Sequence, residues 1–197
     1  LLAVVSALDG RLERALELFP KTRRVVVVTG NAEQDLAVKT ESQQTADLWK
    51  NRLEFEHTDH MSMQEIQKRV GNLPPQTIVI YRAINRDRTG EIFVPYNALL
   101  EITKVANAPV FGLYETLLGD NGIVGGIILN HRLEGERAVR SAMEILRGQL
   151  PSKPLTILPA PLVPMFDWVQ LKRWGMNEAV LPADAMILNK PVSAWER

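Results

Sequence analysis

Four consecutive valines constrain the fold more than any other stretch of this sequence. They lie in "RRVVVVTGN", bounded by Arg24 and Gly30, shortly after a helix-like segment that Pro20 stops. A strand with one face in water alternates apolar and polar residues, whereas an unbroken apolar run is typical of a strand buried on both faces. Such strands belong to parallel sheets that helices cover on both sides, so the run predicts an α/β fold.

Strand-like and helix-like segments alternate along the first 150 residues. Strands are expected within 23–31, 54–60, 76–84, 110–115 and 122–130. Helices are expected within 8–20, 32–53, 62–75, 95–109 and 133–148. Ser62 and Glu65 have the spacing of a capping box, and Leu36, Leu48 and Trp49 lie roughly on one stripe that would face the sheet. Right-handed crossovers then give a doubly wound, flavodoxin-like parallel sheet of about five strands.

Charge and composition narrow the classes of partner. Lys plus Arg number 23 and Asp plus Glu number 23, so the net charge favours neither nucleic acid nor an acidic membrane surface as a partner. The chain has no cysteine, which excludes a disulfide framework, a thiol nucleophile and a thiolate metal site. No apolar run approaches the roughly 18 to 20 residues of a transmembrane helix. A neutral chain of this kind is expected to bind a small molecule or another protein.

The ligand crevice of an open α/β sheet lies outside the carboxyl ends of its strands. This rule selects the loops at 30–31, 81–85, 114–116 and 122–126, whose amide, phenol, guanidinium and carboxylate groups suit a small polar or amphipathic ligand. The predicted ligand-binding residues are Asn31, Tyr81, Arg82, Tyr114, Glu115, Thr116 and Gly125. They do not form a catalytic set, so no catalytic residue, metal or cofactor is expected.

Other chemistries are weaker interpretations of the same sequence. His57 and His60 in "HTDH" do not converge in a strand-to-loop segment, and a third metal ligand is not apparent. The glycine-rich "GDNGIVGG" precedes a strand and matches neither dinucleotide nor Walker patterns, so a turn is favoured over a phosphate cradle. Acid–base catalysis by Glu115 and Asp120 is a further alternative, and no serine lies in a GxSxG elbow.

The pattern changes after residue 150. Six prolines lie between Pro151 and Pro182, and the segment has no long helical pattern. Three of the chain's four tryptophans fall in the last 30 residues: Trp168, Trp174 and Trp195. We expect "FDWVQLKRWG" to form a short helix that docks by its aromatic face, with Asp167 as N-cap. The tryptophans are expected to anchor the segment and not to stack on a ligand, because they lie outside the strand-end crevice.

Three stretches carry a family resemblance: "LFPKTRRVVVVTG", "NAPVFGLYETLLGDNGIVGGIILN" and the closing run from "PMFDWVQLKRWGMNEAVLP" to "NKPVSAWER". Together they resemble the periplasmic-binding-protein-like sensor regions ahead of the kinase core in some bacterial sensor histidine kinases. Those regions are similar to the ABC transporter substrate-binding family of type I periplasmic binding proteins. The resemblance implies two lobes that close on a ligand. Residues 1–150 would be the second lobe, with the first lobe missing here, and 151–197 a Pro/Trp-rich tail leading toward a membrane segment.

The resemblance also implies a function. The chain would be a non-catalytic, extracytoplasmic (periplasmic) ligand-sensing domain of a membrane-anchored, two-component histidine kinase, binding a small molecule between its lobes. The alternative is the solute-binding component of an ABC importer. Expected partners are the small-molecule ligand and the missing first lobe; a partner chain in a homodimer is left open.

Overall fold

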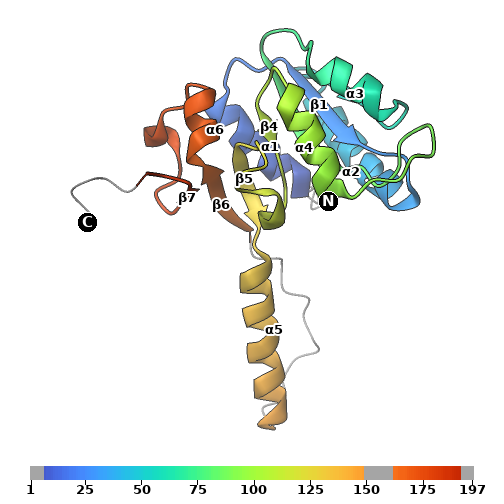
Figure 1. Ribbon diagram of the computed structural model, residues 1–197. Coiled ribbons are helices and arrows are strands. Elements are labelled where there is room, and N and C mark those ends of the chain that lie inside the picture. Colours follow the sequence, from blue (N-terminus) through green and yellow to red (C-terminus); the bar gives the residue numbers. More distant parts are fainter. Residues whose placement is uncertain (1–6, 149–161, 192–197) are drawn as a thin grey trace.

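A parallel sheet forms the centre of the computed structural model, which describes residues 7–148 and 162–191 (Figure 1). Its strands are β1 (Arg24–Thr29), β2 (Glu54–His57), β3 (Thr77–Ala83) and β4 (Val110–Phe111), in the order β2-β1-β3-β4. The four valines lie in β1 between two neighbours, and each is 0% exposed. The prediction of a strand buried on both faces is therefore confirmed.

A further strand, β5 (Gly125–Leu129), lies beside the short β4 at the edge of this sheet. Val124 N donates to Val110 O at 2.7 Å, and Leu129 N donates to Leu113 O at 3.0 Å. A parallel bridge also joins Tyr114 to Leu129. The parallel sheet itself has four strands, and β5 is attached beside β4 by these bonds; the doubly wound arrangement is confirmed, with one strand fewer in the sheet than the roughly five predicted.

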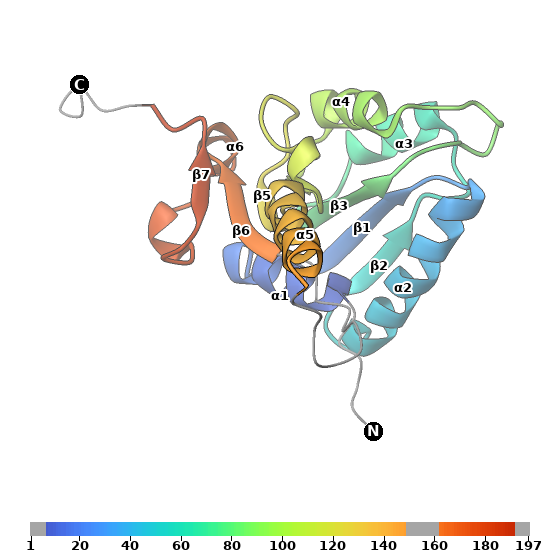
Figure 2. The ribbon, with the colours of Figure 1, turned by 90° about the horizontal axis from the view of Figure 1, so that it is seen from below.

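Helices cover both faces of the sheet, as Figure 2 shows. Helices α3 (Met63–Val70) and α4 (Pro95–Val105) pack on one face with Val26 and Val28, while α1 (Ala7–Leu18) packs on the other with Val25 and Val27. Helix α2 (Glu33–Trp49) lies beside α1. Successive valines thus face opposite layers, as strand geometry requires.

The buried face of α2 differs from the predicted apolar stripe. Leu36 and Leu48 are 47% and 66% exposed, and Trp49 is half-buried, whereas Asp35, Ser42 and Thr45 are buried. The prediction of a helix is confirmed, but the orientation assigned to Leu36 and Leu48 is wrong. Polar side chains occupy the inward positions because they hydrogen-bond there, as Asp35 does with the loops around it.

The C-terminal segment is joined to the lobe more closely than an extended tail implies. It contains β6 (Leu162–Asp167), α6 (Trp168–Arg173), the 3₁₀ turn η2 (Glu178–Val180) and β7 (Met186–Leu188). β6 pairs antiparallel with β5 and parallel with β7, forming a three-stranded sheet. Residues 151–161 and Trp195 lie outside the described residues.

The predicted short helix in "FDWVQLKRWG" is confirmed as α6. Asp167 is its N-cap, and its carboxylate accepts a hydrogen bond from Gln170 N at 2.9 Å. Phe166 is fully buried, and Trp174 packs against the same core cluster. Trp168 donates from Nε1 to Glu178 at 3.0 Å. Aromatic side chains therefore fasten this helix to the lobe and to the turn that follows it.

Helix α5 (His131–Leu146) follows β5 and projects away from the rest of the molecule (Figure 1). None of its residues is buried. Within the described part of the chain, no helix combines the length and apolarity needed to cross a membrane.

Candidate functional site

The loops after β1 and β3 meet at the carboxyl edge of the sheet. Gly30 N donates to Ala83 O at 3.0 Å, and Asn31 N donates to Arg86 O at 2.8 Å. The Arg86 guanidinium donates in return to the side-chain and backbone oxygens of Asn31, at 3.2 and 3.1 Å. Asn31 and Arg86 are thus held side by side although 55 residues separate them. Loops fixed in this way present their polar groups in one geometry.

Asp35, in the first turn of α2, joins these two loops by hydrogen bonds. Its carboxylate accepts hydrogen bonds from Ala32 N at 3.1 Å, Asn85 N at 3.2 Å and Asn85 Nδ2 at 2.6 Å. The side chain is buried, so these bonds to a carboxylate are shielded from water. A Cβ on Gly30 would overlap both Arg86 O and the Asp35 carboxylate, which explains a glycine at this point.

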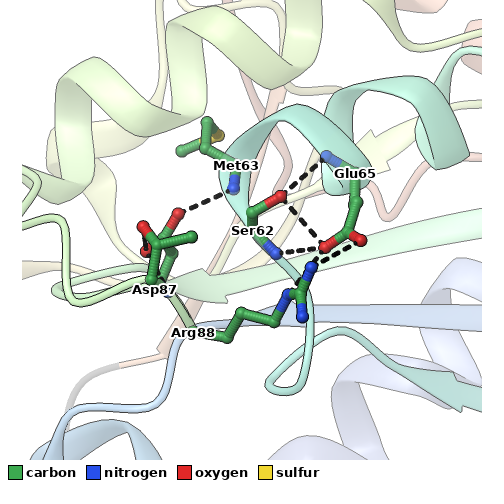
Figure 3. Close-up of polar contacts among 6 residues, drawn as sticks. Ser62, Met63, Glu65, Asp87 and Arg88 are labelled. Atoms are coloured by element: carbon green, nitrogen blue, oxygen red, sulfur yellow. Dashed lines mark hydrogen bonds and ion pairs between the residues drawn. The ribbon is translucent and has the colours of Figure 1, made fainter.

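A second buried carboxylate, Asp87, joins the same loop to the start of α3 (Figure 3). It accepts hydrogen bonds from Met63 N at 2.9 Å and Thr89 N at 2.8 Å. Burial alone would raise the pKa of Asp87, but its hydrogen bonds from Thr89, Met63 and Glu91 outweigh burial and lower it. Asp87 is thereby kept ionised.

The capping box of α3 is confirmed and is linked to this loop. Ser62 Oγ accepts from Glu65 N at 3.3 Å, and Ser62 N donates to the Glu65 carboxylate at 2.8 Å. Arg88 then contacts both oxygens of Glu65, at 2.9 and 2.8 Å (Figure 3). Hydrogen bonds, first from Ser62 and then from Arg88, lower the pKa of Glu65. The 85–91 loop is therefore bonded to the N-terminal turns of two helices. Asn85 bonds to Asp35 of α2, and Asp87 and Arg88 bond to the first turn of α3.

Two of the predicted ligand-binding residues, Tyr81 and Arg82, have inward-facing side chains. Tyr81 is fully buried; its hydroxyl donates to Pro95 O at 2.5 Å, and burial raises its pKa. Arg82 is 8% exposed and forms an ion pair with Glu41 at 2.5 Å. The two side chains lie on opposite faces of β3. Of the predicted residues in the first two loops, Asn31 is the half-exposed one.

Tyr114, Glu115 and Thr116 lie at the end of β4, where residues 115–117 form the turn η1 (Glu115–Leu117). Tyr114 is half-buried and its ring stacks on His131, with centroids 6.0 Å apart and planes at 7°. Thr116 is exposed and Glu115 is half-exposed. These residues extend the edge toward the base of α5.

Gly125 does not join the other predicted residues. It begins β5, at the opposite end of that strand from Leu129, and its neighbour across the sheet is Phe166 of β6. A Cβ there would overlap Met165 O, and its φ is +114°. The glycine permits β6 to approach, because no other residue leaves that space.

Sequence reasoning did not single out the surface beside α3. A depression of about 700 Å³ is lined by residues of the β2–α3 loop, of α3 and the turn after it, and of the 85–91 loop: His60, Met61, Glu65, Lys68, Arg69, Asn72 and Arg88. The sequence predicted the capping box at Ser62 and Glu65 but not its partner Arg88. Only the fold brings Glu65 and Arg88 into contact.

Trp168 and Trp174 lie away from the carboxyl edge. Trp174 lines a groove of about 620 Å³ together with Phe19, Pro74 and Pro109, which come before the amino-terminal ends of β1, β3 and β4. The groove is therefore on the edge opposite the candidate site. For Trp168 and Trp174, this position agrees with the prediction that the tryptophans lie outside the strand-end crevice.

The chemistry of the carboxyl edge is that of hydrogen bonding. Its accessible side chains are an amide, a guanidinium, a carboxylate and a hydroxyl, from Asn31, Arg86, Glu115 and Thr116. These groups can donate to and accept from a small polar molecule. Among residues 7–148 and 162–191, no three His, Asp or Glu side chains gather as a metal site would require.

Solved structures share this fold. The ligand-free, open form of a substrate-binding protein with adhesive properties from Clostridium difficile matches 95% of this chain and 61% of its own, with a TM-score of 0.66 and 17% identity. A conserved domain protein from Vibrio cholerae matches 92% and 60%, with a TM-score of 0.60 and 19% identity. An ABC domain from Streptococcus pneumoniae in complex with L-Trp matches 91% and 60%, with a TM-score of 0.59 and 13% identity.

These matches place the chain in the type I periplasmic-binding-protein-like fold and agree with one lobe of such a protein. The chain spans about 60% of the length of each of these proteins. No family model and no curated protein sequence matches it.

Proposed function

We propose that this chain is the second lobe of a two-lobe domain that binds a small molecule, and that the domain is the extracytoplasmic sensor of a two-component histidine kinase. The observation that carries the first part is the fold: nearly the whole chain superposes on about three fifths of a substrate-binding protein. The ligand-binding surface would be the carboxyl edge, where loops far apart in sequence are fixed by buried carboxylates.

The proposed role of this edge is non-catalytic. Its accessible groups are placed for hydrogen bonding, and the buried Asp35 and Asp87 are saturated with hydrogen bonds from the backbone and from neighbouring side chains. A ligand held against it by a first lobe would favour the closed arrangement by the difference in its affinity for closed and open forms. Binding would thus become a change in the positions of the lobes.

The sensor assignment rests on the C-terminal segment. Its "DWVQLKRWG" run resembles the kinase-linked sensor regions, and its strand β6 pairs with β5 of the lobe over five residue pairs. A segment attached along a whole strand would move with the lobe. Such attachment supports transmission of lobe movement toward a downstream membrane segment.

The second candidate is the solute-binding component of an ABC importer. It is favoured by the neighbours themselves, since one is named a substrate-binding protein and another is an ABC domain in complex with L-Trp. The parent gene discriminates between the two. A hydrophobic run of about 20 residues followed by a kinase core after Arg197 supports the sensor, and a stop codon there refutes it.

Ligand binding is tested by a thermal-shift screen of the two-lobe protein against amino acids, aromatic compounds and small organic acids. A ligand of this surface should raise the melting temperature of the native protein, and Arg86→Gln should reduce the shift. Arg14→Gln changes an exposed arginine of α1 that pairs only with Glu17 among the described residues, and it should leave the shift intact. If none of these compounds shifts the native protein, the small-molecule proposal fails for those classes.

A further inference from the structure

The depression beside α3 is bordered by cations that carboxylates only partly balance. Arg69 donates from Nε and Nη2 to the two oxygens of Glu56, each at 2.6 Å. Arg88 binds both oxygens of Glu65 with the same two nitrogens, as Figure 3 shows. The ammonium group of Lys68, the third cation of the lining, forms no hydrogen bond or ion pair with residues 7–148 or 162–191. The positive charge of Lys68 is therefore left over.

The two carboxylates orient the guanidinium groups without using all of their donors. A guanidinium has five N–H donors in one plane, and each of these two-point contacts uses two of them. Nη1 of Arg69 and Nη1 of Arg88 have no hydrogen-bond partner within the described ranges. Because both groups are already oriented, an acceptor at these free edges would order little further side chain. Glu56 is also shared with Arg24, at 4.0 Å, so its charge does not cancel that of Arg69 completely.

The rest of the lining suits the organic body of a ligand. The depression has a volume of about 700 Å³, which is within the range of small-molecule sites and exceeds what a bare ion fills. Met61 is half-buried, packs against the core and offers an apolar wall. Asn72 is exposed, and its Nδ2 donates to Lys68 O at 2.9 Å, which leaves Oδ1 to accept from a ligand. The exposed His60 adds an imidazole from the loop before α3.

We propose that this depression binds the phosphate group of a small organic molecule, held by Lys68 and by the free edges of Arg69 and Arg88. A carboxylate has two oxygens, which one guanidinium satisfies alone. A phosphate group carries nearly two negative charges and three acceptor oxygens, so it can engage three separate cations at once. The site goes beyond the proposed function, because it needs neither a first lobe nor the ligand of the carboxyl edge. The two surfaces share the 85–91 loop, which supplies Arg86 to one and Arg88 to the other.

Nuclear magnetic resonance of the two-lobe protein labelled with ¹⁵N-arginine tests the proposal, with inorganic phosphate and glycerol 3-phosphate as probes. The Nε–H signals of Arg69 and Arg88 should shift saturably with either probe, and chloride at equal ionic strength should leave them in place. Lys68→Gln should weaken phosphate binding by about fivefold, the effect of one unit charge about 4 Å away in water. Lys104→Gln is the matched control, because Lys104 is also an exposed lysine in the last turn of its helix, and this variant should bind as the native protein does.

Tighter binding of glycerol 3-phosphate than of inorganic phosphate supports an organic phosphate, whereas equal or weaker binding would reassign the depression to the free ion. Shifts that chloride reproduces, or that grow without saturation, would overturn the site. So would equal weakening by Lys68→Gln and Lys104→Gln, or tighter binding of the dicarboxylate succinate. Arg86→Gln should leave the shifts of Arg69 and Arg88 unchanged, since Arg86 belongs to the carboxyl edge. Loss of those shifts in Arg86→Gln would assign the phosphate to that edge instead.

Discussion

Replacing Asp35 by alanine should loosen the carboxyl edge of the sheet and destabilise the whole domain. The carboxylate is 1% exposed and accepts three hydrogen bonds, from Ala32 N, Asn85 N and Asn85 Nδ2. Each buried donor left without a partner costs about 1–3 kcal/mol. Ala32 and Asn85 are half-exposed, so water can replace part of the lost bonding. We therefore take about 1 kcal/mol for each donor, or about 3 kcal/mol of unfolding free energy in total.

The measurement is urea unfolding followed by far-ultraviolet circular dichroism, with thermal melting as a second probe. A loss of about 3 kcal/mol lowers the melting temperature by roughly 6 to 12 °C in a chain of this size. Asp47→Ala provides the matched control, because Asp47 lies exposed on the same helix and should change stability by less than about 0.5 kcal/mol. If Asp35→Ala were as stable as Asp47→Ala, Asp35 would not be what joins the two loops.

Three further predictions concern packing and titration. Gly125→Ala should destabilise the protein by about 2 kcal/mol more in urea than Gly119→Ala, because both glycines have positive φ but only Gly125 has a backbone oxygen in the space of the new Cβ. Burial chiefly lowers the pKa of His57, so the unfolded chain binds more protons than the folded one, and the free energy of unfolding should fall as pH drops below about 6.5. His57→Gln should remove this pH dependence of the unfolding free energy in urea titrations. Hydrogen bonds from two lysines and then from Trp168 lower the pKa of Glu178 to about 2, so its stabilising effect should be present above pH 4.5 and lost as pH falls toward 2; Glu178→Gln should shift Trp168 emission to the red at neutral pH.

Local patterns were sufficient to predict the framework of the fold. The valine run of β1 and the capping box at Ser62 each depend on residues close together in sequence, and both are present as expected. Asp167 was also identifiable as an N-cap, because the cap bond spans only three residues. A short segment largely determines whether it forms an apolar strand or a capped helix terminus, so these features can be predicted from local sequence.

The details of the site depend on contacts that no local pattern encodes. Asp35 and Asn85 are 50 residues apart, and neither has a distinctive sequence context. Tyr81 and Arg82 were selected because they lie near the end of a strand. Side chains at a strand end can still point into the layers that cover the sheet, and those of both residues are buried in this way. Gly125 was selected as part of a glycine-rich loop, yet its environment is set by β6, about 40 residues later.

Strand β5 connects the proposed binding edge with helix α5 and with the C-terminal segment. Its carboxyl end contacts Tyr114, continues into α5 and pairs at Leu129 with Leu162 of β6. A movement of α5 at its base would therefore act on the same strand to which the C-terminal segment is attached. Paired strands resist sliding, since a shift of one residue breaks every hydrogen bond of the ladder and reverses its side chains. The strands β5 and β6 would thus move as one unit, which is what the proposed sensor would require of the C-terminal segment.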